Sequence, residues 1–305
     1  MQVESYFGRR SASPLLLSIF ILALSFPAFA QDNDVITIDT PLVIMNATVT
    51  DKEGRPALGL KKEQFEVTER GTRQEIEIFE TQETPFAAVI LIDTSGSMEQ
   101  RVSLARAAAI KFLDGIRPDD QVAIYNFDSR LSLVQDFSNL RDLMPAGFDL
   151  KASGWTALND AVFNAAEELS KRNEKRKAII VLSDGADTRS GKSASKALDA
   201  ALEANATIYT VDMSGLNTGG SARMQNRGVL KKFANRTGGR FIETPGGVQM
   251  RQAFENIVEE LGIQYTIGYY PTDNTRDGKW REIELKVSPD SLDVRTRKGY
   301  NAPSK

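Results

Sequence analysis

The chain has 305 residues, of which 41% are hydrophobic and 26% are charged, and its formal net charge is −3; this composition fits a soluble protein of about two domains with apolar cores. The acidic balance, with no basic stripe, excludes nucleic acid as the expected partner. The chain has neither cysteine nor histidine, which excludes disulfides, zinc–thiolate sites, Ser-His-Asp triads and HExxH metalloproteases, so that any bound metal must be held by oxygen.

The first thirty residues follow the pattern of an export signal. Arg9 and Arg10 form a basic start, residues 14–26 form an apolar run, and Ala28-Phe29-Ala30 offers a small-x-small cleavage pattern. The apolar run is shorter than the about 20 residues that span a bilayer, although an uncleaved membrane anchor is the alternative. We therefore expect a signal peptide over residues 1–30, no membrane span in the mature chain, and a location in the periplasm, in the medium or on the cell surface.

Residues 34–84 have the pattern of β-strands. Residues 42–50 are rich in β-branched side chains, and the stretches 65–68 and 76–79 alternate between apolar and polar residues on either side of the turn 69–72. This segment is therefore predicted to form the first of two β segments.

Residues 86–262 show a different pattern, in which continuous apolar runs alternate with helical periodicity. Apolar runs without alternation suit strands that are buried on both faces of a parallel sheet. The runs are residues 87–92, 122–127, 178–182 and 206–211, and the helical faces lie within 102–116 and 158–169. Strands that alternate with helices predict an α/β domain with a doubly wound, mostly parallel sheet.

The strand pattern returns in residues 263–305, with alternation in 265–269, 283–287 and 292–296. Neither this segment nor 34–84 is long enough to cover the apolar face of its own sheet. Together they have about the length of one immunoglobulin-like sandwich. We predict that they pack into one β-sandwich-like domain with the α/β domain inserted between them; the alternative is two separate small β appendages.

Two polar segments connect the predicted elements of the α/β domain. The run 171–177 is rich in lysine and arginine and is expected to be a solvated turn between a helix and a strand. Residues 216–221 are rich in glycine and polar residues and follow a strand, so that we expect a loop near the carboxyl edge of the sheet.

A compact group of oxygen-bearing side chains follows the apolar run 87–92. Asp93, Ser95 and Ser97 lie within five residues, at the carboxyl end of a predicted central strand, where open α/β sheets bind ligands. One carboxylate and two hydroxyls form half of a coordination shell for a hard cation. The same residue types also favour helix N-caps, so that the pattern alone leaves both interpretations open.

The pattern Asp93-Thr94-Ser95-Gly96-Ser97 resembles the metal-ion-dependent adhesion site of the von Willebrand factor type A family. In that family a threonine and an aspartate from two later loops complete the site, and the matching positions here are Thr156 in Gly154-Trp155-Thr156 and Asp184 in Leu182-Ser183-Asp184-Gly185. The resemblance covers about residues 86–262. The flanking stretches 269–271, 277–281 and 297–300 resemble an exported bacterial subgroup of the same family.

The resemblance implies a metal-dependent protein-binding or adhesion module. The implied metal ligands are Asp93, Ser95, Ser97, Thr156 and Asp184, and the implied cation is Mg²⁺, with Mn²⁺ or Ca²⁺ as alternatives. Two carboxylates balance a divalent charge, and the neutral hydroxyls leave a position for an acidic side chain of a protein partner. For the rim that contacts this partner we expect Thr94, Gly96, Trp155 and Asn217.

Two other functions remain as alternatives at this point. In the first, the protein is a structural or assembly subunit of an envelope complex, and its metal site is not essential. In the second, the metal and the two aspartates assist hydrolysis. The sequence offers no general base other than carboxylates and no glycine-rich phosphate loop, so that we expect a binding module and not an enzyme.

Overall fold

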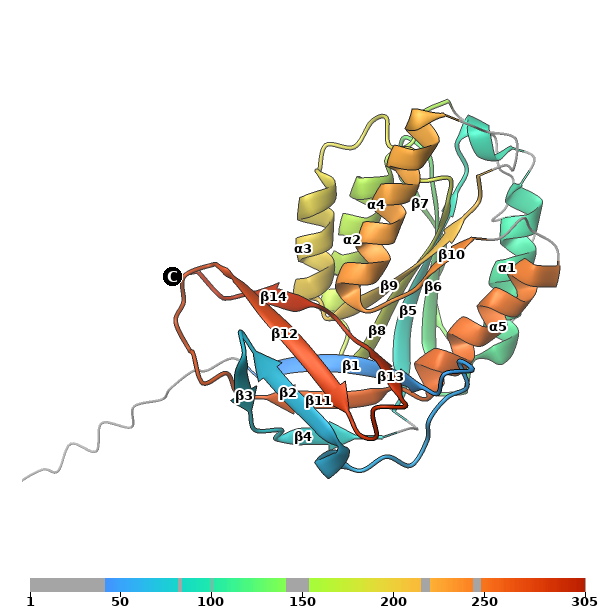
Figure 1. Cartoon of the computed structure of the whole chain (residues 1–305). Coiled ribbons are helices and arrows are strands. Elements are labelled where there is room, and N and C mark those ends of the chain that lie inside the picture. Colours follow the sequence, from blue (N-terminus) through green and yellow to red (C-terminus); the bar gives the residue numbers. More distant parts are fainter. Residues whose placement is uncertain are drawn as a thin grey trace, which may run out of the picture. The chain divides into compact units, whose positions relative to one another are not determined.

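The apolar runs of the central segment become the strands of a six-stranded sheet in the computed structural model (Figure 1). The structure describes residues 42–81, 84–99, 101–140, 154–214, 220–243 and 248–304. The predicted signal peptide and the amino-terminal part of the first β segment lie outside these residues. Residues Thr40–Lys305 form one compact unit, separate from Met1–Asp39.

The central sheet has the strand order β10-β9-β8-β5-β6-β7. Its first five strands are parallel, and only β7 at the edge is antiparallel. The strands are β5 (Phe86–Asp93), β6 (Gln121–Phe127), β7 (Leu131–Ser138), β8 (Arg176–Ser183), β9 (Ala206–Asp212) and β10 (Phe241–Glu243). Every residue of β5 is buried, which explains why its sequence shows no alternation.

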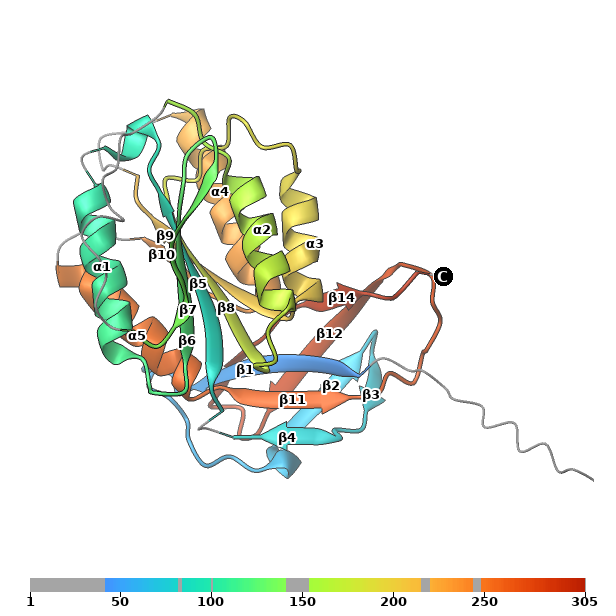
Figure 2. The ribbon, with the colours of Figure 1, turned by 180° about the vertical axis from the view of Figure 1, so that it is seen from behind.

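Helices cover both faces of this sheet (Figures 1 and 2). One face packs against α1 and α5, and the other against α2, α3 and α4, so that each face has its own apolar core. The helices are α1 (Val102–Gly115), α2 (Leu158–Ser170), α3 (Ala194–Glu203), α4 (Ser221–Thr237) and α5 (Val248–Gly262). The predicted mostly parallel, doubly wound α/β sheet is confirmed.

The flanking segments interleave in two further four-stranded sheets, β13-β1-β11-β4 and β14-β12-β2-β3. The strands are β1 (Val43–Thr50), β2 (Phe65–Glu69), β3 (Thr72–Gln74), β4 (Ile78–Glu80), β11 (Tyr265–Tyr269), β12 (Trp280–Val287), β13 (Asp293–Arg295) and β14 (Gly299–Asn301). Short 3₁₀ turns occur at Lys62–Gln64 and Gly96–Met98. In both sheets, strands that precede the α/β part pair with strands that follow it.

A single apolar core joins the two flanking sheets. It contains Met45 and Val67 from the amino-terminal segment and Ile267 and Leu285 from the carboxyl-terminal segment. Tyr269 also donates a hydrogen bond of 2.7 Å to the buried carboxylate of Glu69 across this core. Buried residues of the two β segments therefore share one hydrophobic core.

The run 171–177 differs from the expected solvated turn at its end, because Arg176 and Lys177 are the first residues of β8. Arg176 begins β8 and its side chain has no solvent exposure. Its guanidinium donates to the carbonyls of Thr81, Leu261, Gly262 and Gln264. The sequence of a basic run does not show which of its lysine or arginine side chains can donate hydrogen bonds to backbone carbonyls elsewhere in the fold.

Candidate metal centre

The candidate site lies at the carboxyl end of β5, the strand that β6 and β8 flank in the central sheet. Asp93 is the last residue of β5 and is fully buried. Its Oδ1 accepts a 2.9 Å hydrogen bond from the backbone N–H of Ser95. This local turn brings the Asp93 carboxylate toward the loop that follows it.

The loop after β5 places two hydroxyls beside each other. The Oγ atoms of Ser95 and Ser97 are 3.2 Å apart, and Gly96 between them begins a short 3₁₀ turn that ends at Met98. Ser95 is buried and Ser97 is exposed. The loop therefore places one hydroxyl, that of Ser95, in the interior near Asp93 and a second, that of Ser97, at the surface.

The neighbouring strand β8 contributes a second set of polar groups. Ser183 at its end donates a 2.6 Å hydrogen bond from Oγ to Oδ2 of Asp93 and accepts one of 3.0 Å from the N–H of Gly185. Asp184 follows directly, and its Oδ1 accepts a 3.0 Å hydrogen bond from the N–H of Ala186. Burial is the main cause that raises the pKa of the Asp93 carboxyl, and the charge of Asp184 adds to this effect. The two aspartates are thus electrostatic neighbours.

Thr156 lies in a loop that is tied to both strands beside β5. The next residue, Ala157, donates its backbone N–H to the carbonyl of Asp128, which follows β6, at 2.7 Å. The carbonyl of Thr156 accepts from the N–H groups of Thr188 and Arg189, in the loop after β8, at 2.9 and 3.0 Å. Since β6 and β8 flank β5, these bonds hold the Thr156 loop across the carboxyl end of β5.

The chemistry of these donors fits a divalent cation. Burial is the main reason why the pKa of Asp93 rises to about 6, with the Asp184 charge adding to it, while hydrogen bonds from Ser183 and Ser95 act in the opposite direction. A cation would relieve both the desolvation and the repulsion between the carboxylates. No group of three or more His, Cys, Asp or Glu side chains that could hold a metal occurs in the described ranges.

The expected partner-contacting rim is partly described. Thr94 is buried, and its Oγ1 donates a 3.2 Å hydrogen bond to the carbonyl of Phe127, so that this side chain faces the protein. Gly96 is exposed, and Trp155 has 54% of its surface exposed. Asn217 lies outside the described residues.

Two supporting residues near Thr156 were not expected from the sequence. Thr188 donates from Oγ1 to the Thr156 carbonyl at 3.4 Å and accepts from the Thr156 N–H at 2.9 Å. The guanidinium carbon of Arg189 lies 5.8 Å from the centre of the exposed Trp155 ring. Neither residue belongs to the Asp-x-Ser-x-Ser pattern, and the only available signal was their position shortly after Asp184.

Residues 88–186 match the family model described as the von Willebrand factor type A domain. These residues contain the whole constellation from Asp93 to Asp184. The chain carries a von Willebrand factor type A domain. Nothing in the match extends to the flanking β-sandwich.

Relatives among characterised and uncharacterised proteins share about a third of this chain. This chain is 31% identical over 118 residues to inter-alpha-trypsin inhibitor heavy chain H4 of Bos taurus, and the aligned region covers 34% of this chain and 13% of that protein. This chain is 30% identical over 106 residues to an uncharacterized protein of Synechocystis sp., and the aligned region covers 33% of this chain and 25% of that protein. The chain thus spans a quarter or less of the length of these relatives.

Solved structures with a similar arrangement include a von Willebrand factor type A protein from Catenulispora acidiphila, at 13% identity and a TM-score of 0.48, covering 82% of this chain and 76% of that one. The von Willebrand domain of the type V pili tip protein from Porphyromonas gingivalis is 15% identical with a TM-score of 0.47, covering 58% and 94%. The PilB minor pilin from Streptococcus sanguinis is 13% identical with a TM-score of 0.44, covering 59% and 62%.

Proposed function

We propose that this protein is an exported protein-binding module in which a divalent cation at the end of β5 joins the protein to an acidic side chain of its partner. Asp93, Ser95, Ser97, Thr156 and Asp184 are the proposed ligands, and Mg²⁺ is the proposed cation, with Mn²⁺ or Ca²⁺ as alternatives. When bound, the cation would supply an electrophilic position that accepts a carboxylate oxygen.

The observation that carries this proposal is the environment of Asp93. A fully buried carboxylate beside a second carboxylate is costly unless a positive charge compensates it, and the described residues place no lysine or arginine in an ion pair with Asp93. Ser183 and the N–H of Ser95 hold both carboxylate oxygens by hydrogen bonds. These contacts orient the side chain but do not neutralise it.

The proposal includes a division of the chain. We propose a signal peptide over 1–30, a von Willebrand factor type A domain over 86–262, and a β-sandwich formed by 34–84 and 263–305. Export to the periplasm or the cell surface rests on the amino-terminal sequence pattern. Among the described residues, none of the helices is long and apolar enough to cross a membrane.

Metal binding is tested with a matched pair of threonine variants. Thr156→Val and Thr94→Val each remove one buried hydroxyl with little change of shape. Mn²⁺ binding, followed by electron paramagnetic resonance, is expected to weaken at least tenfold in Thr156→Val and to remain within twofold of wild type in Thr94→Val. Equal Mn²⁺ affinity in wild type, Thr156→Val and Asp184→Ala would contradict the ligand assignment.

Partner binding is tested by capture from an envelope extract with Mg²⁺ and with EDTA. We expect proteins that wild type captures in Mg²⁺ to be absent with EDTA and with Thr156→Val. Capture that persists under both conditions would favour the structural or assembly role. Turnover of a substrate that disappears in Asp184→Ala would be needed to support hydrolysis, for which no general base other than carboxylates is present.

A further inference from the structure

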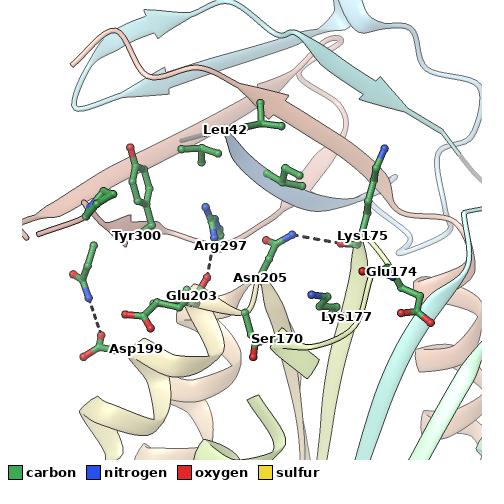
Figure 3. A pocket seen from close by; sticks show the side chains of 17 residues that line it. Leu42, Ser170, Glu174, Lys175, Lys177, Asp199, Glu203, Asn205, Arg297 and Tyr300 are labelled. Carbon is green, nitrogen blue, oxygen red and sulfur yellow. Dashed lines mark hydrogen bonds between the residues drawn. The ribbon is translucent and has the colours of Figure 1, made fainter. Parts of the chain in front are cut away.

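A cavity lies beside the amino-terminal ends of β8 and β9, whereas the candidate metal centre lies at the carboxyl ends of the central strands. Figure 3 shows the side chains that line this cavity. Its volume is about 450 Å³. One wall is the start of β1, with Val43 and Ile44, and another is the segment that leads into β8 together with the end of α3. Arg297 and Tyr300 from the carboxyl-terminal segment also line it.

The start of β1 has an open edge at this cavity. In an antiparallel ladder, hydrogen-bonded and non-hydrogen-bonded pairs alternate, and the backbone groups of a non-hydrogen-bonded pair point to the outer edges. Ile44 lies opposite Gly268 in β11, and the Gly268 carbonyl accepts from the N–H of Glu77, on the side of β4. The N–H and C=O of Ile44 therefore point away from β11.

The outer neighbour of β1 does not reach this position. β13 pairs only with Thr48–Thr50 of β1. Toward the start of β1, the same edge makes one more contact, a 2.8 Å hydrogen bond from Thr296 Oγ1 to the carbonyl of Asn46. Within the described part of the chain, the backbone of Ile44 has no hydrogen-bond partner on this edge. An unpaired strand edge is a template for an added strand.

Two cations, Arg297 and Lys177, line the same cavity. Arg297 is only 8% exposed, and its Nη1 donates to the carbonyl of Leu202 at 3.1 Å, while its Nε is buried without an acceptor. Burial lowers the pKa of Arg297 to about 10 and also lowers the pKa of Lys177. Neither residue forms an ion pair with another described residue.

Three acidic residues, Glu174, Asp199 and Glu203, also line the cavity. Figure 3 shows Arg297, Asn205 and Lys177 in the middle of the view, with Glu174 to one side and Asp199 and Glu203 to the other. Glu174 is paired with Arg172 at 2.6 Å, and Asp199 accepts a 3.0 Å hydrogen bond from Asn301. The middle of the cavity thus combines an open strand edge with two cations, of which Lys177 also interacts with the charge of Glu174.

We propose that this cavity binds an extended peptide segment of a partner, which adds a strand to β1 and places a carboxylate side chain against Lys177 and Arg297. The main chain of the peptide would pair with the N–H and C=O of Ile44, as in other cases of strand addition. The carboxylate would supply the charge-assisted hydrogen bonds that the buried guanidinium lacks. This site is separate from the metal centre and needs no cation.

The test uses labelled peptides of alternating valine and threonine that differ only in one central glutamate or glutamine. Fluorescence anisotropy in EDTA is expected to show at least tenfold tighter binding of the glutamate peptide to wild type. Lys177→Gln should remove this preference and leave the glutamine peptide unchanged. Lys171→Gln is the matched control, because Lys171 is in the same basic run but is paired with Glu168.

Strand addition is tested by removing backbone hydrogen-bond donors, first from the protein and then from the peptide. Ile44→Pro deletes the N–H that points to the open edge and leaves the ladder with β11, since proline is tolerated at strand edges. We expect it to weaken both peptides at least tenfold. A peptide methylated on alternate backbone nitrogens should lose binding to unmodified protein, which tests the same contact should Ile44→Pro fail to fold.

Three results would overturn the proposal. The first is the absence of binding by either peptide, and the second is equal binding of the methylated peptide. The third is concentration-dependent dimerisation of wild type that Ile44→Pro removes, since the occupant would then be a second copy of this chain. Because all measurements are made in EDTA, their outcome is independent of the proposed metal-dependent function.

Discussion

Ser183, the last residue of β8, donates a 2.6 Å hydrogen bond to Oδ2 of Asp93, the last residue of β5. The two strands are parallel neighbours, with Ile92 opposite Leu182, so that their ends reach the same edge of the sheet. The bond orients a buried carboxylate with a neutral donor. It does not neutralise the charge of the carboxylate, and this leads to the first prediction.

The metal-free protein should become more stable relative to Asp93→Asn as the pH falls. The pKa of Asp93 is about 6 in the folded protein, compared with 3.8 for an unperturbed carboxyl, and this difference corresponds to about 3 kcal/mol. Because the folded-state pKa is raised, the penalty is present in full above pH 6 and disappears as the pH falls toward 4. In EDTA at pH 7.5, Asp93→Asn should therefore unfold at a higher denaturant concentration than wild type.

The control for this prediction is Mg²⁺. Added Mg²⁺ should stabilise wild type at pH 7.5 by binding the folded state and should have little effect on Asp93→Asn. If wild type and Asp93→Asn keep the same difference in unfolding free energy from pH 4.5 to 7.5 in EDTA, the burial of Asp93 has no electrostatic cost and the argument for a cation fails.

Arg176 should contribute strongly to the free energy of unfolding, because it joins the central sheet to the β-sandwich. It is fully buried and donates to backbone carbonyls before β5, at the end of α5 and before β11. Arg176→Met keeps much of the volume but leaves these acceptors unpaired, and we expect a loss of about 3–5 kcal/mol of unfolding free energy. Lys175→Met, at the exposed neighbour, should cost less than about 1 kcal/mol. Urea denaturation of both variants and of wild type measures these changes in unfolding free energy.

Arg176 also illustrates what the sequence does and does not determine. The fold class follows from local patterns, because strands buried on both faces must be apolar throughout and the sandwich strands must alternate. The pairing of the two β segments followed from their inability to bury an apolar face alone. The inward turn of Arg176 depends on carbonyls that are distant in sequence, and no local pattern reports them.

In the candidate site too, features that depend on neighbouring residues in the sequence could be predicted, and contacts between distant residues could not. The position of Asp93 at the end of a buried strand could be predicted, since its apolar run is unbroken up to that residue. The hydrogen bonds of the Thr156 carbonyl to the backbone of Thr188 and Arg189 could not, because backbone donors leave no trace in side-chain identity. The open edge at Ile44 depends on the register between β1 and β11, which sequence alternation does not fix.

The exposed pair of Trp155 and Arg189 should affect partner binding without affecting the metal. Trp155 precedes a proposed ligand, and the guanidinium of Arg189 stacks on its ring at 5.8 Å. Exposed aromatic and arginine side chains dominate many binding surfaces, so that Trp155→Ala should weaken a Mg²⁺-dependent partner at least tenfold while Mn²⁺ affinity stays within twofold. Lys192→Ala, which removes a cation that lies over Phe163 at 4.6 Å, is the control. A matching loss of Mn²⁺ affinity in Trp155→Ala would mean that the indole supports the Thr156 loop instead.

Two glycines near α4 should respond in opposite directions to the same change to alanine. A Cβ on Gly239 would lie 1.9 Å from the carbonyl oxygen of Ile208 in β9, a backbone atom that cannot move aside without breaking the sheet. Gly239→Ala is therefore expected to destabilise the protein by about 3 kcal/mol or to prevent folding. Gly228, inside α4, has nothing within 4 Å of the position that an added methyl group would take, and Gly228→Ala should stabilise the helix by about 0.5–1 kcal/mol. Thermal unfolding of both variants measures the difference, and similar melting temperatures would show that the backbone at Gly239 does not approach Ile208 as closely as this contact requires.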